Sequence, residues 1–161
     1  MKISIVMTVY NGERYLKEQI DSFLNQTLLP DEIIIVDDCS SDKTIEIIEK
    51  YKKNYSDKIK FFKNEHNLGF TKNFEKAISK SSGDVIFLSD QDDFWYKNKI
   101  QTVIKKYETY PNIDLIIHDA DLVNENLKKT NHSALSQVMS GFNNTDVFIT
   151  GALTSFKKNL L

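Results

Sequence analysis

The chain has 161 residues, of which 40% are hydrophobic and 27% are charged, and its formal net charge is −2. This composition fits one soluble globular domain, and the single cysteine, Cys39, excludes an internal disulfide. Nucleic-acid binders normally carry a basic excess and several arginines. Here 23 acidic residues face 21 basic ones and Arg14 is the only arginine, so we expect no nucleic-acid partner.

Strand-like and helix-like patterns alternate along the chain. Continuous apolar, often β-branched runs predict strands that are covered on both faces. Apolar residues spaced three and four apart predict amphipathic helices, and Pro30 and Pro111 separate elements. The predicted strands are residues 3–9, 32–36, 59–63, 85–88, 113–117 and 147–156. The predicted helices are residues 13–26, a helix capped by Ser41 or Asp42 that carries Ile45, Ile48 and Tyr51, and residues 70–80 and 98–110.

None of the apolar runs is long enough to cross a membrane, because residues 33–36 and similar runs fall far short of the ~20 residues needed. The first residues lead directly into a strand pattern and lack the apolar core and cleavage site of a signal peptide. We therefore expect a cytoplasmic protein. Residues 124–146 are polar and without a firm period, which indicates an excursion from the core.

Alternating strands and helices predict an α/β fold with a mostly parallel sheet and helices on both faces. Ligands of such sheets bind beyond the carboxyl ends of the strands. Acidic residues follow three of the predicted strands at that edge, namely Asp37 and Asp38, then Asp90, Asp92 and Asp93, then Asp119 and Asp121.

Carboxylates gathered at one edge raise one another's pKa unless a cation neutralises them. Clustered aspartates with little histidine favour Mg²⁺ or Mn²⁺, whose open positions phosphate oxygens can fill. In an extended segment Asp90 and Asp92 point the same way, so both can face one ion. The alternative is that these residues form turns or cap helices, as Asp93 can.

Two common nucleotide-binding motifs are absent from the sequence. Neither the Gly-x-Gly-x-x-Gly nor the Gly-x-x-x-x-Gly-Lys-Ser/Thr pattern occurs, so the glycines of a dinucleotide-binding or P-loop site are not present. Phe94 and Trp95 are interpreted as core anchors of the following helix, with substrate stacking by Trp95 as the alternative. The histidines have no metal-like spacing and are interpreted as surface or loop residues: His66, His118 and His132.

The ordered motifs carry a family resemblance. Residues 4–12, 22–27 and 32–42, followed by Asn67-Leu68-Gly69, Asn73, Gly83-Asp84 and residues 88–95, together resemble the start of family 2 glycosyltransferases with the GT-A fold. Ser89 to Trp95, residues 149–152 and residues 156–161 are most similar to the rhamnosyltransferase-like branch of that family.

The resemblance implies roles for the matching residues. Thr8 and Tyr10 would border the nucleotide base, and Asp38 would accept a hydrogen bond from the ring N–H of uracil or thymine. Many relatives carry arginine at the position of Lys72, and a lysine lacks the bidentate fork of arginine. The implied nucleotide-sugar-binding residues are Thr8, Tyr10, Asp38, Asn67, Gly69, Lys72, Asn73, Asp90 and Gln91. Asp92 would ligate the metal, with Asp90 as a further ligand.

The implied reaction is an inverting transfer from a UDP- or dTDP-sugar to a cell-surface glycan or lipid-linked acceptor at the inner face of the membrane. For the rhamnosyltransferase-like branch the donor would be dTDP-rhamnose. Mn²⁺ or Mg²⁺ would stabilise the leaving diphosphate, and a carboxylate base would take the acceptor proton. We find no convincing base, because Asp119 and Asp121 come too early and Asp146 lacks the acidic context. By the resemblance, the catalytic base is expected beyond Leu161.

We therefore expect residues 1–161 to form a single GT-A nucleotide-sugar-binding domain, truncated before its acceptor half is complete and inactive in transfer by itself. One alternative is a non-catalytic nucleotide-sugar-binding module. Another is a phospho-receiver domain, whose acidic pair should follow the first strand, where this chain instead has Thr8-Val9-Tyr10-Asn11.

Overall fold

The computed structural model describes residues 1–124, 128–134 and 153–160. Its elements, in chain order, are β1 (Ile3–Val9), α1 (Leu16–Leu24), β2 (Glu32–Asp37), α2 (Thr44–Asn54), β3 (Ile59–Lys63), α3 (Phe70–Ser79) and β4 (Val85–Ser89). They continue with α4 (Lys99–Thr109), β5 (Leu115–Ile117), β6 (Asp121–Val123), β7 (Lys129–Ser133), β8 (Thr154–Lys157) and the short 3-10 helix η2 (Lys158–Leu160).

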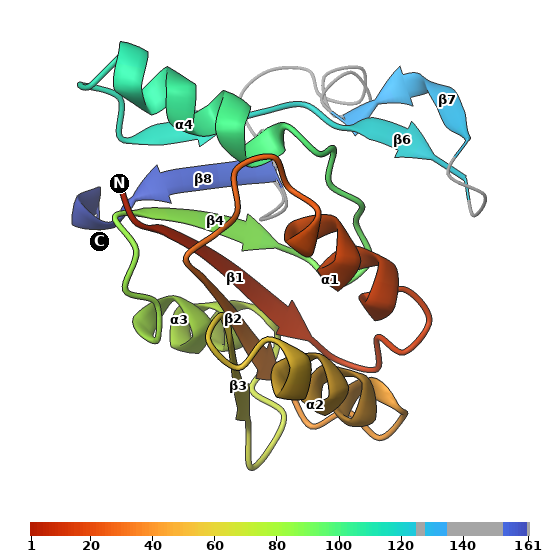
Figure 1. The fold of residues 1–161 in the computed structure, drawn as a ribbon. Coiled ribbons are helices and arrows are strands. Elements are labelled where there is room, and N and C mark those ends of the chain that lie inside the picture. Colours follow the sequence, from red (N-terminus) through yellow and green to blue (C-terminus); the bar gives the residue numbers. More distant parts are fainter. Residues whose placement is uncertain (125–127, 135–152, 161) are drawn as a thin grey trace.

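The main sheet has the strand order β3-β2-β1-β4-β8-β5 (Figure 1). β1 pairs in parallel with β2 and β4, and β2 pairs in parallel with β3. β8 lies between β4 and β5 and is antiparallel to both. β6 and β7 form a separate two-stranded sheet. The prediction of a mostly parallel α/β sheet is confirmed.

Two predicted helix starts differ from the structure. α1 begins at Leu16 rather than at residue 13, because residues 13–15 form a turn in which the Gly12 carbonyl accepts the N–H groups of Tyr15 and Leu16. The predicted cap of α2 by Ser41 or Asp42 is wrong, because the N-cap residue is Lys43 and no side chain caps the helix. Asp42 lies one residue earlier, and its carboxylate accepts the Thr44 N–H.

The predictions for the end of the chain are tested only in part. The last strand begins at Thr154, and residues 147–152 of the predicted strand lie outside the described residues. Leu160 is the last residue of η2, whereas Asp146 and Leu161 also lie outside the described residues. The expectation that the catalytic base lies beyond Leu161 therefore stays a prediction.

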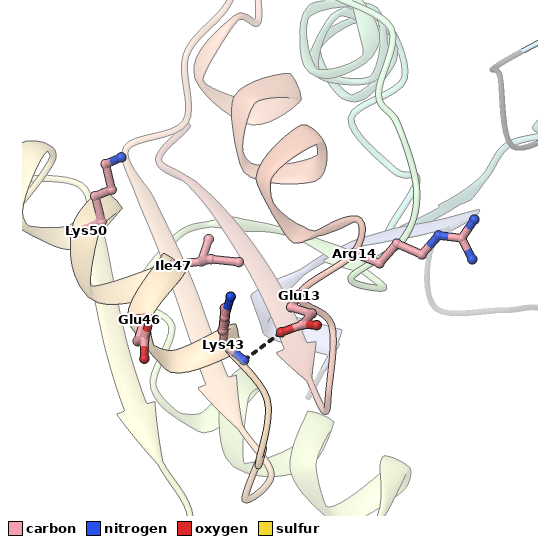
Figure 2. A pocket seen from close by; sticks show the side chains of 6 residues that line it. All are labelled: Glu13, Arg14, Lys43, Glu46, Ile47 and Lys50. Atoms are coloured by element: carbon pink, nitrogen blue, oxygen red, sulfur yellow. Dashed lines mark hydrogen bonds between the residues drawn. The ribbon is translucent and has the colours of Figure 1, made fainter.

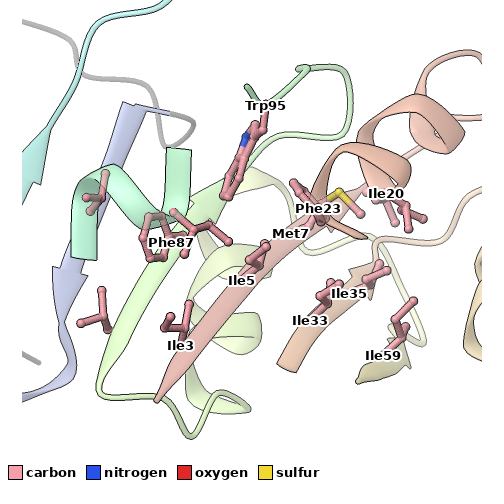
Figure 3. Packing of buried hydrophobic residues seen from close by; sticks show 14 of the residues in the cluster. Ile3, Ile5, Met7, Ile20, Phe23, Ile33, Ile35, Ile59, Phe87 and Trp95 are labelled. Carbon is pink, nitrogen blue, oxygen red and sulfur yellow. The ribbon is translucent and has the colours of Figure 1, made fainter. Parts of the chain in front are cut away.

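Alternate residues of the central strands face opposite layers of helices, as expected from the two-residue period of a strand. On one face Ile5 and Met7 pack with α1, α2 and α4, and Figure 3 shows Phe23 and Trp95 on that side. On the other face Val6 packs with Phe74 of α3. Helices therefore cover both faces of the sheet, as predicted.

Phe94 and Trp95 follow β4 but have opposite environments. Trp95 is 2% exposed and its ring centroid lies 4.7 Å from that of Phe23 and 5.9 Å from that of Phe87. Phe94 is 52% exposed. The prediction of a core anchor is thus confirmed for Trp95 and wrong for Phe94, because consecutive side chains on this segment point in different directions.

A buried carboxylate joins the amino ends of the strands. Glu32 is 2% exposed and accepts hydrogen bonds from the Ser4 hydroxyl (2.6 Å), the Lys60 ammonium (2.6 Å) and both the N–H and hydroxyl of Ser82. Burial by itself would raise the pKa of Glu32. The hydrogen bonds from Lys60, Ser4 and Ser82 outweigh burial and lower this pKa to about 2.

We expect Glu32→Gln to lower the free energy of unfolding at neutral pH by roughly 3 kcal/mol, the linkage energy of that pKa shift. The folded-state pKa lies below the usual value of 4.5, so the stabilisation is complete above pH 4.5 and is lost as the pH falls toward 2. Urea unfolding of both proteins at neutral pH and near pH 2 checks this. A difference that stays constant between the two pH values would contradict it.

Candidate functional site

The carboxyl ends of β1, β2, β3 and β4 meet at one edge of the sheet. Val9 pairs with Asp37, Asp37 pairs with Lys63, and Met7 pairs with Ser89. The segments that follow these strands therefore start side by side. They carry most of the residues predicted to bind a nucleotide sugar.

Asp38 organises the loop between β3 and α3. Its Oδ1 accepts hydrogen bonds from Asn64 Nδ2 (2.6 Å) and the Leu68 N–H (2.8 Å), and its Oδ2 accepts the Gly69 N–H (2.9 Å). The Asn67 side chain donates back to the Asp38 carbonyl (3.1 Å). Asp38 is only 3% exposed. Asp38 thus lies beside Asn67 and Gly69, from which it is about 30 residues distant in sequence.

Asn64 is the residue of this cluster that the sequence did not reveal. Besides contacting Asp38, its side chain donates to Asn73 Oδ1 (2.9 Å) and accepts from Lys76 Nζ (2.7 Å). Asn73 is 3% exposed and donates to the Val36 carbonyl, so it connects Asn64 to the backbone of β2. Lys72, on the first turn of α3, is exposed.

Cys39 follows Asp38 with a φ of 68°, in the left-handed region, and its thiol donates to the Asn64 carbonyl at 3.2 Å. We expect Cys39→Val to unfold more easily than Cys39→Gly by about 2 kcal/mol, because a β-branched residue is strained at positive φ and glycine is not. Urea unfolding of the matched pair measures the difference. Equal stabilities would show that this backbone relaxes at no cost.

The acidic loop after β4 is a turn rather than an extended segment. Residues 91 and 92 form the turn, so the geometric basis for placing Asp90 and Asp92 on one face of a strand is wrong. The carboxylates are nevertheless close enough to interact. Burial raises the pKa of Asp90 to about 6, and the charges of Asp93 and Asp92 contribute in the same direction. Burial also raises the pKa of Asp93. A cation at this loop would relieve that repulsion.

The three remaining nucleotide-site predictions lie on β1, just beyond it and on the acidic loop. Thr8 is 8% exposed on β1, and Tyr10, just beyond the strand, is 51% exposed. The Gln91 side chain forms hydrogen bonds with both the N–H and the carbonyl of Tyr10. Tyr10, which is predicted to border the nucleotide base, and the acidic loop are therefore in direct contact.

A polar cluster beside the acidic loop was not expected from the sequence. Burial lowers the pKa of Lys99 to about 7, and its ammonium lies 3.7 Å from the centroid of the Trp95 ring. Burial, with the Lys99 charge, lowers the pKa of His118 to about 4. Within the part of the chain that the structure describes, Asp93 Oδ2, Trp95 Nε1 and His118 Nε2 have no hydrogen-bond partner.

A groove of about 560 Å³ lies between the loop before α1 and helix α2 (Figure 2). Its lining carries charges of both signs, and the Glu13 carboxylate accepts the Lys43 N–H at 2.9 Å. None of the predicted nucleotide or metal residues lines it. The lining residues are Glu13, Arg14, Lys43, Glu46, Ile47 and Lys50. The strand-end loops are thus the better candidate site, since they carry the converging carboxylates and amides.

The acidic loop offers a cation few protein ligands. Across residues 1–124, 128–134 and 153–160, no three His, Cys, Asp or Glu side chains are grouped so that they could hold a metal ion. Asp90 and Asp92 still fit a hard divalent cation that takes its other ligands from phosphate and water, as Mg²⁺ commonly does. Over the same residues, no helix is long and apolar enough to cross a membrane.

Comparison with known proteins decides the family. The model of the family described as glycosyl transferase family 2 matches residues 4–159. The chain belongs to this family. Membership of this family excludes the phospho-receiver alternative.

Individual relatives agree with the family. EpsE of Bacillus subtilis is 32% identical over 115 residues, 71% of this chain and 41% of EpsE. The dTDP-rhamnosyl transferase RfbG of Shigella flexneri is 37% identical over 102 residues, 61% of this chain and 35% of RfbG. The crystal structure of S. aureus TarS in complex with UDP is 29% identical with a TM-score of 0.70, covering 78% of this chain and 37% of that one.

These comparisons confirm the GT-A fold and the predicted resemblance to the rhamnosyltransferase-like branch. The chain spans about two-fifths of the length of the first curated relatives that it matches (41% and 39%).

Proposed function

We propose that this chain is the donor-binding part of an inverting glycosyltransferase that transfers a sugar from a UDP- or dTDP-sugar. The observation that carries the proposal is the position of two loops at the same edge of the sheet, beyond the ends of β2 and β4, which flank β1 on either side. One loop is organised around Asp38, and the other carries Asp90 and Asp92. The Asp38 loop suits the base of a nucleotide donor, and the acidic loop suits its diphosphate.

The nucleotide would lie across the ends of β1 and β2. Tyr10 offers an exposed aromatic ring, and Thr8 lies two residues before it on β1. A carboxylate has about four lone-pair positions, and Asp38 uses three of them internally. The fourth, on Oδ2, suits the ring N–H of uracil or thymine. Asn67, Gly69, Lys72 and Asn73 would border the same pocket, with Asn73 acting from beneath.

Asp92 and Asp90 would hold Mn²⁺ or Mg²⁺ against the diphosphate. Such a cation supplies positive charge that stabilises the leaving diphosphate. The protein's own contribution is to fix the two carboxylates in a loop where burial and the Asp92 and Asp93 charges already raise the pKa of Asp90. The raised pKa supports the proposal because it means that the ionised Asp90 carboxylate is disfavoured. A bound cation would stabilise the ionised form.

The acceptor half, with the catalytic base beyond Leu161, would lie outside these 161 residues. We propose a cell-surface glycan or lipid-linked acceptor, a cytoplasmic location at the inner face of the membrane, and dTDP-rhamnose as one candidate donor, as the name of RfbG suggests. We do not propose Asp119 or Asp121 as the base. Asp121 is engaged by Lys129 (2.7 Å) and by the Tyr96 hydroxyl (2.6 Å).

Calorimetry on the 161-residue chain with UDP, dTDP and GDP, each with Mn²⁺ and with a chelator, tests the proposal. We expect UDP or dTDP to bind more tightly with Mn²⁺ than with the chelator, and GDP to bind more weakly, because its purine is larger than the pyrimidine that the proposal assigns to this pocket. If none of the three nucleotides binds with Mn²⁺ present, the donor-site proposal is refuted.

A non-catalytic nucleotide-sugar-binding module is the second candidate, because residues 1–124, 128–134 and 153–160 include the donor-loop residues but none that we assign as a base. The two candidates differ in the longer protein. A catalytic protein that includes the acceptor half would release UDP or dTDP from a donor sugar when an acceptor is supplied. A binding module would hold the donor without releasing it.

A further inference from the structure

Gln91 lies between the two acidic residues of the loop, yet its side chain serves Tyr10. Its Oε1 accepts the Tyr10 N–H at 2.8 Å, and its Nε2 donates to the Tyr10 carbonyl at 3.1 Å. One amide thus satisfies both polar groups of one backbone residue, as a neighbouring strand would. The regular β1–β4 pairing ends at Met7 and Ser89, so Gln91 continues the connection beyond the last paired residues.

Gly12 makes room for this amide. A Cβ at Gly12 would lie 2.6 Å from Gln91 Oε1 and 2.8 Å from Gln91 Cδ, both too close for real atoms. The Gly12 N–H and carbonyl are engaged by Thr44 and by the first turn of α1. The backbone is therefore held in place, and the Gln91 amide is the group that would have to leave. The absence of a side chain at Gly12 is thus a requirement of the Gln91–Tyr10 contact.

We propose that Gln91 is a positioning residue that acts through Tyr10 rather than by contacting the donor. Both polar ends of its amide are engaged by the Tyr10 backbone. Its neighbours Asp90 and Asp92 belong to the proposed metal side, and the exposed Tyr10 ring belongs to the proposed base side. Gln91 therefore sets the distance between the two ends of the donor pocket. The inference rests on the proposed function and specifies how that site is assembled.

Hydrogen exchange of the Tyr10 amide in the free chain tests the contact without any ligand. We expect exchange to be at least about tenfold faster in Gln91→Ala and in Gly12→Ala than in the wild type. Gly12→Ala should lower the urea midpoint in the wild-type background and have little effect in a Gln91→Ala background, where the added methyl meets no amide. Unchanged Tyr10 exchange, or equal midpoint shifts in both backgrounds, would overturn the contact.

UDP titrations with Mn²⁺ test the positioning role by a double-mutant cycle. We expect Gln91→Ala to weaken UDP binding by about tenfold in the wild-type background and by less than about twofold in a Tyr10→Ala background, where no ring is left to position. The same loss in both backgrounds would show direct contact with the donor and overturn the proposal. An unchanged affinity in Gln91→Ala would also overturn it.

The two measurements separate this inference from the proposed function. If the wild-type chain binds neither UDP nor dTDP, the donor site and the positioning role for it both fail, while Tyr10 exchange still decides whether the contact exists. If the wild type binds UDP but the cycle is additive, the donor site stands and only the positioning role is lost.

Discussion

Asp92→Asn is expected to abolish the Mn²⁺-dependent part of UDP binding and to leave the metal-free affinity unchanged. The exposed Asp92 carboxylate lies in the turn after β4, where its charge already raises the pKa of Asp90. An amide is neutral and a far weaker ligand for a hard cation, so the bridge to the diphosphate is lost. We expect a loss on the order of 100-fold in affinity, about 2.7 kcal/mol.

Calorimetric titration of UDP with Mn²⁺ and with a chelator measures the effect. Asp57→Asn is the matched control, because Asp57 is an exposed aspartate before β3 at the opposite edge of the sheet. It should bind UDP as the wild type does. If Asp92→Asn kept the full response to Mn²⁺, Asp92 would not be the metal ligand.

Asp38→Ala is expected to reduce both stability and nucleotide affinity. Three donors lose their acceptor, namely Asn64 Nδ2 and the N–H groups of Leu68 and Gly69. Hydrogen bonds to charged groups contribute roughly 1.5–3 kcal/mol each. Because water can replace part of these bonds in a half-buried loop, we expect the free energy of unfolding to fall by about 4 kcal/mol. Urea unfolding measures the loss, and Asp57→Ala should stay within about 0.5 kcal/mol of the wild type.

The two roles of Asp38 can be separated by comparing UDP with CDP. The N3 position of uracil is a donor, whereas that of cytosine is an acceptor, so a carboxylate favours uracil. We expect the wild type to prefer UDP and Asp38→Asn to lose that preference, because an amide can either donate or accept. A variant that binds both nucleotides more weakly but keeps the preference would mean that Asp38 only supports the loop.

The strand-end loops were predictable because each residue is marked by a local signal. Asp38 and Asp90 follow apolar runs that can only be buried strands, and parallel strands end at the same edge. The identity of the partners was not predictable. Asn64 reads as an ordinary polar loop residue, and nothing near it in the sequence indicates that it joins Asp38 to Asn73 and Lys76.

The acidic loop shows the same limit. The sequence placed Asp90 and Asp92 correctly at the end of β4, but the assumption of an extended backbone was wrong because residues 91 and 92 form a turn. Gln91 was assigned to the nucleotide pocket by resemblance, whereas in the structure its amide contacts the backbone of Tyr10, 81 residues away. No periodic pattern records a contact over such a separation.

The sequence by itself determined the α/β class, the order along the chain of the strands in the main sheet, the two buried faces of that sheet and the family motifs, whereas β6 and β7 were not predicted. The predicted features follow from short-range periods of burial and from turn residues. Only the tertiary structure decided that β8 inserts antiparallel between β4 and β5, and that Glu32, Asp38 and Gln91 each connect distant segments. The physical reason is that a local period records which side of an element is buried, whereas hydrogen-bond partners are set by which elements meet in space.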